Sequence, residues 1–275
     1  MDLALQALVI GIVQGLTEFL PISSSGHLIA IPYMLGWSDP FLDSLQFTVM
    51  LHLGTLAALV VYFWRDWLRL VPAGLAAVRD RSFRGDADRR LAWLILASTI
   101  PAAIVGLLFS DAIENQIRQI GMVTVALVVG AGIIGVADRW GSKTLGLERL
   151  TFPGAFGIGV AQAIALVPGV SRSGISISAG LFLGLTREAA ARYSFLMSAP
   201  IIAGSGAYET RKLLAGETGI PVEWVPLVVG MLAAFVTGLV AIGFLLRWLR
   251  THRMTIFVVY RLVLAAIIVV VALAR

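Results

Sequence analysis

Two short polar stretches interrupt an otherwise apolar chain, and they hold the residue types that could do chemistry. The first, at 14–27, reads QGLTEFLPISSSGH, and the second, at 168–174, reads PGVSRSG. In both, a proline is followed by the pattern S-x-S-G. Free backbone N–H groups at the start of a helix favour an anion, and serine hydroxyls can add further hydrogen bonds. The two stretches therefore predict a site for a phosphate-type group.

The first stretch carries candidates for acid–base and nucleophilic work. Gln14 and Glu18 are four residues apart and share one face of a helix. A carboxylate in an apolar segment is costly and functional by default, so we expect Glu18 to act and not merely to reach the membrane edge. His27 could transfer a proton near neutral pH, and Ser24 is a candidate nucleophile. The alternative for His27 is a hydrogen-bonded structural histidine.

The second stretch adds a cation. Arg172 offers a planar, multidentate guanidinium, which suits phosphate oxygens. A carboxylate beside a phosphate would repel it, so we expect a divalent cation, Mg²⁺ or Ca²⁺, held by oxygen ligands from Glu18 and Gln14. The remaining residues expected to line this cradle are Ser23, Ser25, Gly26, Ser171, Ser173 and Gly174.

The composition indicates where such a site lies. Of the 275 residues, 59% are hydrophobic and 13% charged, against about 25% charged in soluble domains. The sequence therefore predicts an all-α polytopic membrane protein with a single membrane-embedded domain, 1–275. There is no cysteine, which excludes disulfides and thiolate metal sites. The net charge of +5 is mostly arginine, which points to topology and lipid contact and not to nucleic acid.

Six stretches are long and apolar enough to span as helices. They lie near 44–64, 91–109, 120–137, 189–206, 225–247 and 256–274. Two more apolar regions, 3–36 and 152–186, are broken midway by proline, glycine and serine, and each half is too short to cross alone. Such segments are expected as re-entrant helical hairpins, enclosed by protein or by a water-filled cavity.

Basic residues orient the spans. Fifteen of them fall in the loops 65–90, 138–150 and 247–253 or at 187 and 192, against four on the other side. The rich side should be cytoplasmic. The hairpins then enter from opposite faces, and an offset of 148 pairs Ser23 with Ser171 and Phe47 with Phe195. We therefore predict an inverted-topology repeat, about 1–137 and 150–275.

Three further features are expected to be structural or interfacial. His52 lies within a span with no nearby acid, which favours a structural role, and His252 lies among arginines in a cytoplasmic turn. The arginine-rich loop 65–90 is interpreted as a topology determinant and a surface for lipid headgroups.

The stretches 14–27 and 168–177 closely resemble the bacterial undecaprenyl-pyrophosphate phosphatases of the bacitracin-resistance type, over essentially the whole chain. The resemblance implies hydrolysis of undecaprenyl pyrophosphate to the monophosphate carrier, Mg²⁺ or Ca²⁺ dependence, and a site in the bacterial inner membrane that opens to the periplasm. It assigns catalysis to Glu18, His27 and Arg172. Gln14 stands where some members have glutamate. Ser176 stands where others have threonine, which keeps the hydroxyl, and it is expected to line the cradle and bind substrate with the other serines. It does not decide between a serine nucleophile and an activated water.

Two other functions fit parts of the pattern. A secondary transporter or flippase for a phosphorylated polyprenyl lipid would share the repeat and the broken helices, but it would not need a proton donor and a nucleophile. An accessory scaffold would leave the buried Glu18 and Arg172 unexplained. The sequence leaves open whether copies of the chain form a homo-oligomer.

Overall fold

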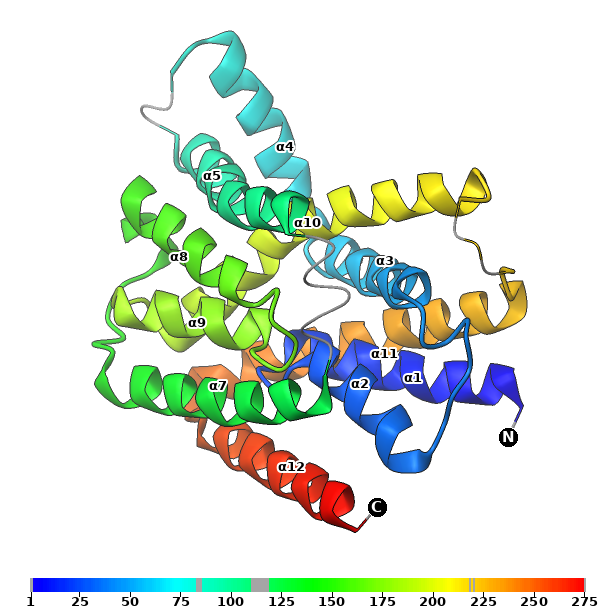
Figure 1. Cartoon of the computed structure of the whole chain (residues 1–275). Coiled ribbons are helices and arrows are strands. Elements are labelled where there is room, and N and C mark those ends of the chain that lie inside the picture. Colours follow the sequence, from blue (N-terminus) through cyan, green and yellow to red (C-terminus); the bar gives the residue numbers. More distant parts are fainter. Residues whose placement is uncertain (1, 83–85, 110–118, 218, 220, 275) are drawn as a thin grey trace.

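The computed structural model describes residues 2–82, 86–109, 119–217, 219 and 221–274. Within these ranges the chain forms eleven α-helices, one 3₁₀ turn (Leu147–Arg149) and no strand. The helices are α1 (Leu3–Phe19), α2 (Ser24–Leu35), α3 (Leu45–Tyr62), α4 (Trp64–Arg79), α5 (Ala87–Leu108), α7 (Ile120–Trp140), α8 (Phe152–Ile164), α9 (Arg172–Phe182), α10 (Arg187–Leu214), α11 (Trp224–Thr251) and α12 (Thr255–Leu273). Most run alongside one another, and both chain ends lie at the same end of the bundle (Figure 1).

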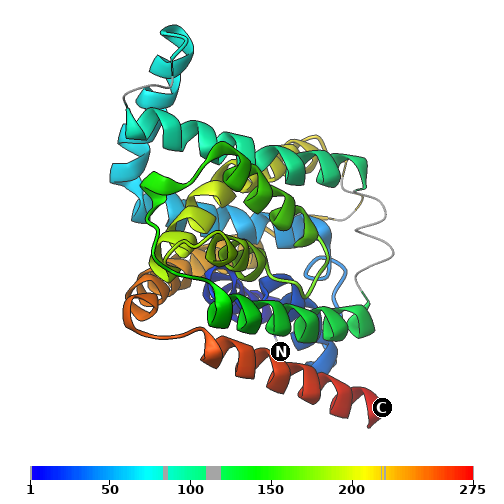
Figure 2. The ribbon, with the colours of Figure 1, turned by 90° about the vertical axis from the view of Figure 1, so that its left-hand side faces the viewer.

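Five helices have the length and apolar character of membrane spans. They are α3, α5, α7, α11 and α12, and they match five of the six predicted spans. In the most apolar 18-residue stretch of each helix, only 28% to 39% is buried inside the protein. Much of the apolar surface of these helices therefore faces outward. Figure 2 shows α5, α7 and α12 at different levels with similar directions. Apolar surface on this scale requires lipid around it. The chain is therefore a multi-pass helical membrane protein.

The sixth predicted span, 189–206, lies inside α10, which has 28 residues. This helix is less apolar than the other five because Arg192 and several hydroxyl-bearing side chains fall in it. Tyr193, Ser194 and Ser198 are buried among protein atoms. These three polar residues of α10 thus face the protein interior, and together with the charged residues in its first and last turns they account for its weak apolar character.

One sequence expectation needs correcting, because the stretch 65–90 is not a loop throughout. Residues Trp64–Arg79 form α4, a helix that projects from the rest of the bundle (Figure 1). Its exposed apolar residues Leu68, Val71, Leu75 and Val78 are spaced three and four apart and so form one stripe. The arginines that flank this stripe make the segment polar in composition, which is why the sequence predicted a loop there.

Both predicted breaks are present. α1 ends at Phe19 and α2 begins at Ser24, whereas α8 ends at Ile164 and α9 begins at Arg172. α1 has 17 residues and α8 has 13, so at ~1.5 Å per residue both are shorter than a ~30 Å hydrocarbon core. The chain therefore turns inside the protein at 20–23 and at 165–171.

The helices before these breaks pack with close backbone contact. α1 packs mainly against α11, and α8 packs mainly against α5. A Cβ added at Gly11 would lie 2.2 Å from the carbonyl oxygen of Gly230 on α11, and one added at Gly159 would lie 2.3 Å from that of Ser98 on α5. Glycine is required at both contacts, and these two glycines are also 148 residues apart.

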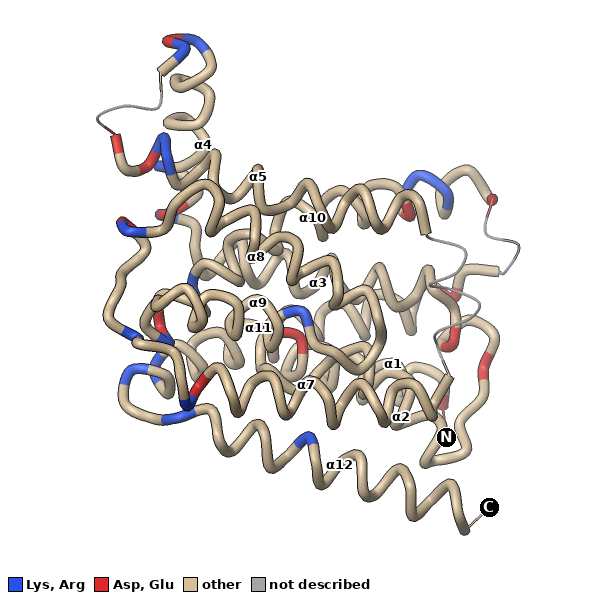
Figure 3. Tube along the Cα trace, turned by 60° about the vertical axis from the view of Figure 1, so that its left-hand side comes forward, with Lys and Arg blue, Asp and Glu red and all other residues tan. Residues whose placement is uncertain are grey.

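The charges divide along the bundle. Lysines and arginines gather mostly at the end where α3 meets α4, α7 leads to α8 and α11 meets α12 (Figure 3). Three ion pairs at this end tie the start of α10 to other helices: Arg187 with Asp138 of α7 at 2.5 Å, Glu188 with α11 and Arg192 with α4. Few charged residues lie in the interior, and one of them, Glu18, is the centre of the site below.

Candidate active site

Glu18, at the end of α1, is the centre of the buried polar cluster. Its Oε2 accepts hydrogen bonds from Gln14 Nε2 at 3.0 Å and from Ser24 Oγ at 2.6 Å. Its Oε1 accepts one from the Arg172 guanidinium. The Glu18 side chain is only 3% exposed, whereas that of Arg172 is 22% exposed. The carboxylate is thus buried with hydrogen bonds at both oxygens, and the guanidinium extends from it toward the surface of the cluster.

The two serine stretches adopt the same local geometry. Ser23 has φ 75° and Ser171 has φ 78°, values that residues other than glycine rarely adopt. Each is the N-cap of the following helix, and its hydroxyl accepts the backbone N–H three residues on, at Gly26 and Gly174. Backbone conformations of this kind persist where the surroundings hold them, and they cluster at functional sites.

The two stretches also meet in space, as predicted. Ser173 Oγ donates to the carbonyl oxygen of Leu20 at 3.0 Å, across the two breaks. Ser24 and Arg172 each occupy the first position of a helix, α2 and α9, and both contact Glu18. Two helix N-termini, with their free N–H groups, therefore lie beside one carboxylate and one guanidinium.

Not every predicted cradle residue has a free hydroxyl. Ser176 is 1% exposed, and its Oγ lies 2.6 Å from both the carbonyl oxygen of Arg172 and the Oγ of Ser194. It therefore joins α9 to α10. Ser25, like Ser24, is only partly buried, and its Oγ lies 3.3 Å from Ser23 Oγ.

His27 lies in α2, on the turn after Ser24, and both of its ring nitrogens have partners. Nδ1 lies 2.7 Å from the carbonyl oxygen of Ser23, and Nε2 lies 2.7 Å from the hydroxyl of Tyr260 on α12. A carbonyl only accepts, so Nδ1 carries the hydrogen and Nε2 accepts from Tyr260 in the neutral ring. No contact joins this ring to Glu18 or Arg172 in the described residues.

The expectation that His52 has no nearby acid is wrong. Its Nε2 lies 3.4 Å from Glu18 Oε2, and its Nδ1 donates to the carbonyl oxygen of Thr48 at 2.7 Å. The acid lies 34 positions earlier in the chain, on α1, and the packing of α1 beside α3 brings the two together. His52 therefore brings a fourth helix, α3, to the Glu18 cluster, beside α1, α2 and α9.

The oxygens around Glu18 fit a hard divalent cation. Gln14 is fully buried, its Nε2 donates to Glu18, and its Oε1 has no hydrogen-bond partner among the described residues. A buried acceptor without a partner costs free energy unless a cation, a water or a donor satisfies it. Carboxylate and amide oxygens are the ligands that Mg²⁺ and Ca²⁺ prefer.

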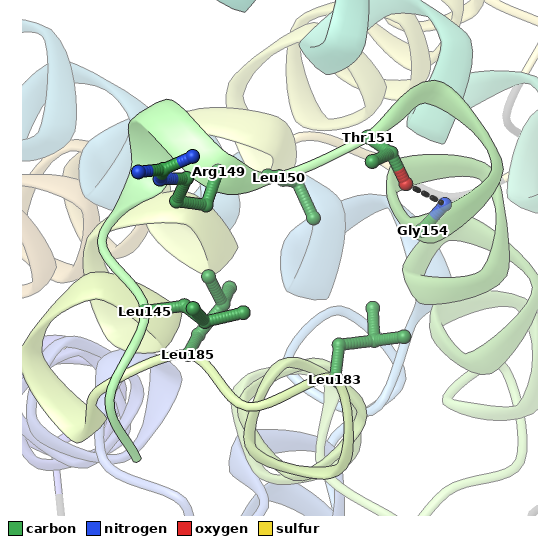
Figure 4. Close-up of a pocket in the computed structure, with 7 residues that line it drawn as sticks. All are labelled: Leu145, Arg149, Leu150, Thr151, Gly154, Leu183 and Leu185. Carbon is green, nitrogen blue, oxygen red and sulfur yellow. Dashed lines mark hydrogen bonds between the residues drawn. The ribbon is translucent and has the colours of Figure 1, made fainter. Parts of the chain in front are cut away.

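A cavity of about 150 Å³ lies elsewhere, between the segment 145–154 and the end of α9. Leucines line most of it, Arg149 lies at its edge, and the Thr151 hydroxyl accepts from Gly154 N at 3.2 Å (Figure 4). It contains none of the predicted site residues.

Fold and site together define a multi-pass helical membrane protein in which a carboxylate, serines and an arginine from separate helices meet inside the bundle. The chain belongs to the family described as bacitracin resistance protein BacA, which it matches over residues 7–267.

Named relatives are similar over nearly their full length. A protein of Desulforudis audaxviator is 44% identical over 98% of both chains. One of Pelobacter propionicus is 46% identical over 98% of this chain and 97% of its own, and one of Geotalea daltonii is 46% identical over 98% of both. All three bear the name undecaprenyl-diphosphatase.

Proposed function

We propose that this protein is an undecaprenyl-diphosphatase, which removes the terminal phosphate of undecaprenyl pyrophosphate and leaves the monophosphate lipid carrier. The observation that carries the proposal is the contact of Ser24 Oγ with Glu18 at 2.6 Å, beside Arg172 and between two helix N-termini. The names of the relatives support the same reaction. Such recycling of the carrier would support cell-wall synthesis and resistance to bacitracin.

The contacts suggest how the chain's own groups divide the work. Arg172 and the N–H groups at the starts of α2 and α9 bind and orient the phosphates. Ser24 Oγ attacks the terminal phosphorus, its proton passes to Glu18, and the anhydride P–O bond breaks with its electron pair on undecaprenyl phosphate. Water then hydrolyses the phosphoserine and releases phosphate. His27, on the next turn of α2, is assigned to proton transfer at the leaving oxygen. This step requires a proton on Nε2, the nitrogen that accepts from Tyr260 in the neutral ring.

A divalent cation completes this proposal. Glu18 and the unpartnered Oε1 of Gln14 are the oxygens that would hold Mg²⁺ or Ca²⁺. When bound, the cation would neutralise charge on the phosphates beside the carboxylate. His52 Nε2 lies 3.4 Å from the same carboxylate, and because Nδ1 donates to Thr48, it would hold the orientation of Glu18 from the side of α3 when Nε2 also carries a hydrogen.

The architecture proposed for the whole chain is one membrane-embedded domain of six spans and two re-entrant hairpins, arranged as an inverted-topology repeat. The matching φ angles and caps at Ser23 and Ser171 support it. So does the exchange in packing, in which α1 of the first half lies on α11 of the second and α8 of the second lies on α5 of the first.

The site is proposed to face the periplasm from the bacterial inner membrane, because the basic end of the bundle should be cytoplasmic. Single cysteines at Ser38 and Ser142, both exposed, test this in intact cells with a membrane-impermeant thiol reagent. We expect labelling at 38 and protection at 142. Labelling at 142 with protection at 38 would invert the orientation.

One observation also supports the rival function, transport of a phosphorylated polyprenyl lipid: broken helices that meet inside a bundle occur in transporters too. Purified protein in detergent, incubated with undecaprenyl pyrophosphate and Mg²⁺, separates the two. We expect one free phosphate and one undecaprenyl phosphate per substrate consumed, and loss of turnover in Ser24→Ala. Intact substrate after incubation with folded wild-type protein would favour transport.

A further inference from the structure

A second arginine lies inside the bundle, on α12, and the function above does not use it. Arg261 is 0% exposed and sits in the apolar span Thr255–Leu273. Among the described residues no carboxylate pairs with it; its guanidinium bonds only to backbone carbonyls. A buried charge inside a membrane span is costly, so its location calls for a reason.

The carbonyls that Arg261 binds come from three places. Two lie in the second break, Gly169 at 2.7 Å and Val170 at 3.1 Å, and one lies in the first break, Pro21 at 3.4 Å. The other two, on α7, are at 3.1 Å. Breaking a helix frees carbonyl groups that must find donors when water is absent. One guanidinium therefore satisfies both breaks at once and fixes them relative to each other.

The neighbouring residue reaches the same region. The hydroxyl of Tyr260 lies 2.7 Å from His27 Nε2, and the two rings stack with centroids 5.6 Å apart and planes 15° apart. His27 in turn bonds to the carbonyl of Ser23 in the first serine stretch. Consecutive residues of α12 thus hold the imidazole and the two breaks.

The surrounding helix is shaped for this arrangement. A Cβ added at Gly130 of α7 would lie 2.1 Å from Arg261 Nη2, so only glycine leaves space for the guanidinium there. α12 packs chiefly against α7 and touches α2. A helix at the edge of the bundle therefore reaches the site through these two side chains.

We propose that Tyr260 and Arg261 are positioning residues for phosphoryl transfer: Tyr260 orients the His27 imidazole through Nε2, and Arg261 sets the distance between the two serine stretches. This rests on the proposed function. Neither residue is assigned a contact with the phosphates. Each acts through groups that do the binding and the proton transfer.

Tyr260→Phe is the sharper test, because it keeps the ring that stacks on His27 and removes only the hydroxyl. We expect kcat to fall about tenfold, of the order that one hydrogen bond supplies, with KM unchanged. The thermal unfolding temperature should fall only slightly, because the buried His27 Nε2 loses its donor while the stacked ring is kept. The ¹⁵N resonance of His27 Nε2, assigned with a His27→Gln variant, should shift as the hydrogen bond is lost. Tyr62→Phe, at a tyrosine 39% exposed on α3, is the matched control and should change none of these.

Arg261→Lys tests whether Arg261 sets the distance between the two serine stretches. Lysine keeps the charge but cannot serve carbonyls on three segments, so we expect kcat to fall at least 100-fold with a smaller change in KM. If this variant does not fold, or folds with kcat within tenfold of wild type, the role assigned to Arg261 in the reaction falls, whereas Tyr260→Phe still decides the role of Tyr260. A Tyr260→Phe protein with kcat within twofold of wild type, or with an unmoved His27 resonance, would overturn the proposal. If wild-type protein releases no phosphate, the proposed function fails, and the resonance still reports whether Tyr260 holds His27.

Discussion

Replacing Arg172 with lysine isolates the geometry of the guanidinium from its charge. Arg172 begins α9, which is fixed by the Ser171 cap and by the bond from Ser173 to Leu20. One of its five N–H donors meets Glu18, and the side chain is 22% exposed. The remaining donors can therefore reach a phosphate while the first stays on the carboxylate.

The structure sets the size of the expected effect. Lysine has three donors on a single atom and cannot span the carboxylate and two phosphate oxygens in one plane. Losing one preorganised donor to developing charge costs ~10²–10³ in kcat, or about 2.7–4 kcal/mol. Because lysine keeps a positive charge beside Glu18, the protein avoids the ~3–5 kcal/mol penalty of an unpaired buried charge. We expect a folded protein with low kcat and a smaller change in KM.

The assay is phosphate release by purified protein over a range of undecaprenyl pyrophosphate concentrations, with thermal unfolding measured alongside. Arg90→Lys is the control, since Arg90 donates to the carbonyl oxygens of Glu148 and Leu150, away from Glu18. A near-normal kcat with only a raised KM in Arg172→Lys would contradict this expectation, because the arginine would then anchor substrate without acting on the transition state.

Two further pairs of variants test the site and the packing. Gln14→Leu should raise the Mg²⁺ concentration for half-maximal rate at least tenfold. Gln162 is its equivalent 148 residues on, and both of its buried amide atoms lack partners in the described structure. Gln162→Leu should therefore keep activity and gain about 1–3 kcal/mol of stability. Equal loss in both variants would contradict this. Gly11→Ala should destabilise by about 1–3 kcal/mol, since its Cβ would lie 2.2 Å from the backbone of α11. Gly132→Ala meets nothing within 4 Å and should be tolerated; matching unfolding curves for these two would show that the contact has room to relax.

Local sequence signals predicted much of this arrangement. Five apolar spans, the two breaks and the meeting of the two serine stretches are confirmed. Each depends on a pattern within about twenty residues, such as an apolar run or a proline followed by serines. Glu18 stood out for the same reason, as a lone carboxylate in an apolar segment, and it is the centre of the cluster.

The features that sequence reasoning missed depend on contacts between distant segments. His52 meets Glu18 only because α3 packs beside α1. Arg261 binds backbone carbonyls, which have no side-chain signature, although an arginine in an apolar span was itself a visible signal. In α4 the spacing of Leu68 and Val71 was visible too, but the surrounding arginines outweighed it.

The most direct test of the account is single-turnover phosphate release by wild-type protein and by Glu18→Gln, each titrated with Mg²⁺ after removal of divalent ions by a chelator. Glutamine keeps the size of Glu18 but removes the charge that Ser24, Arg172 and the proposed cation share. We predict that wild-type turnover disappears with the chelator and returns with Mg²⁺, and that folded Glu18→Gln releases no phosphate at any Mg²⁺ concentration. Mg²⁺-dependent release by Glu18→Gln at the wild-type rate would contradict the central role of this carboxylate.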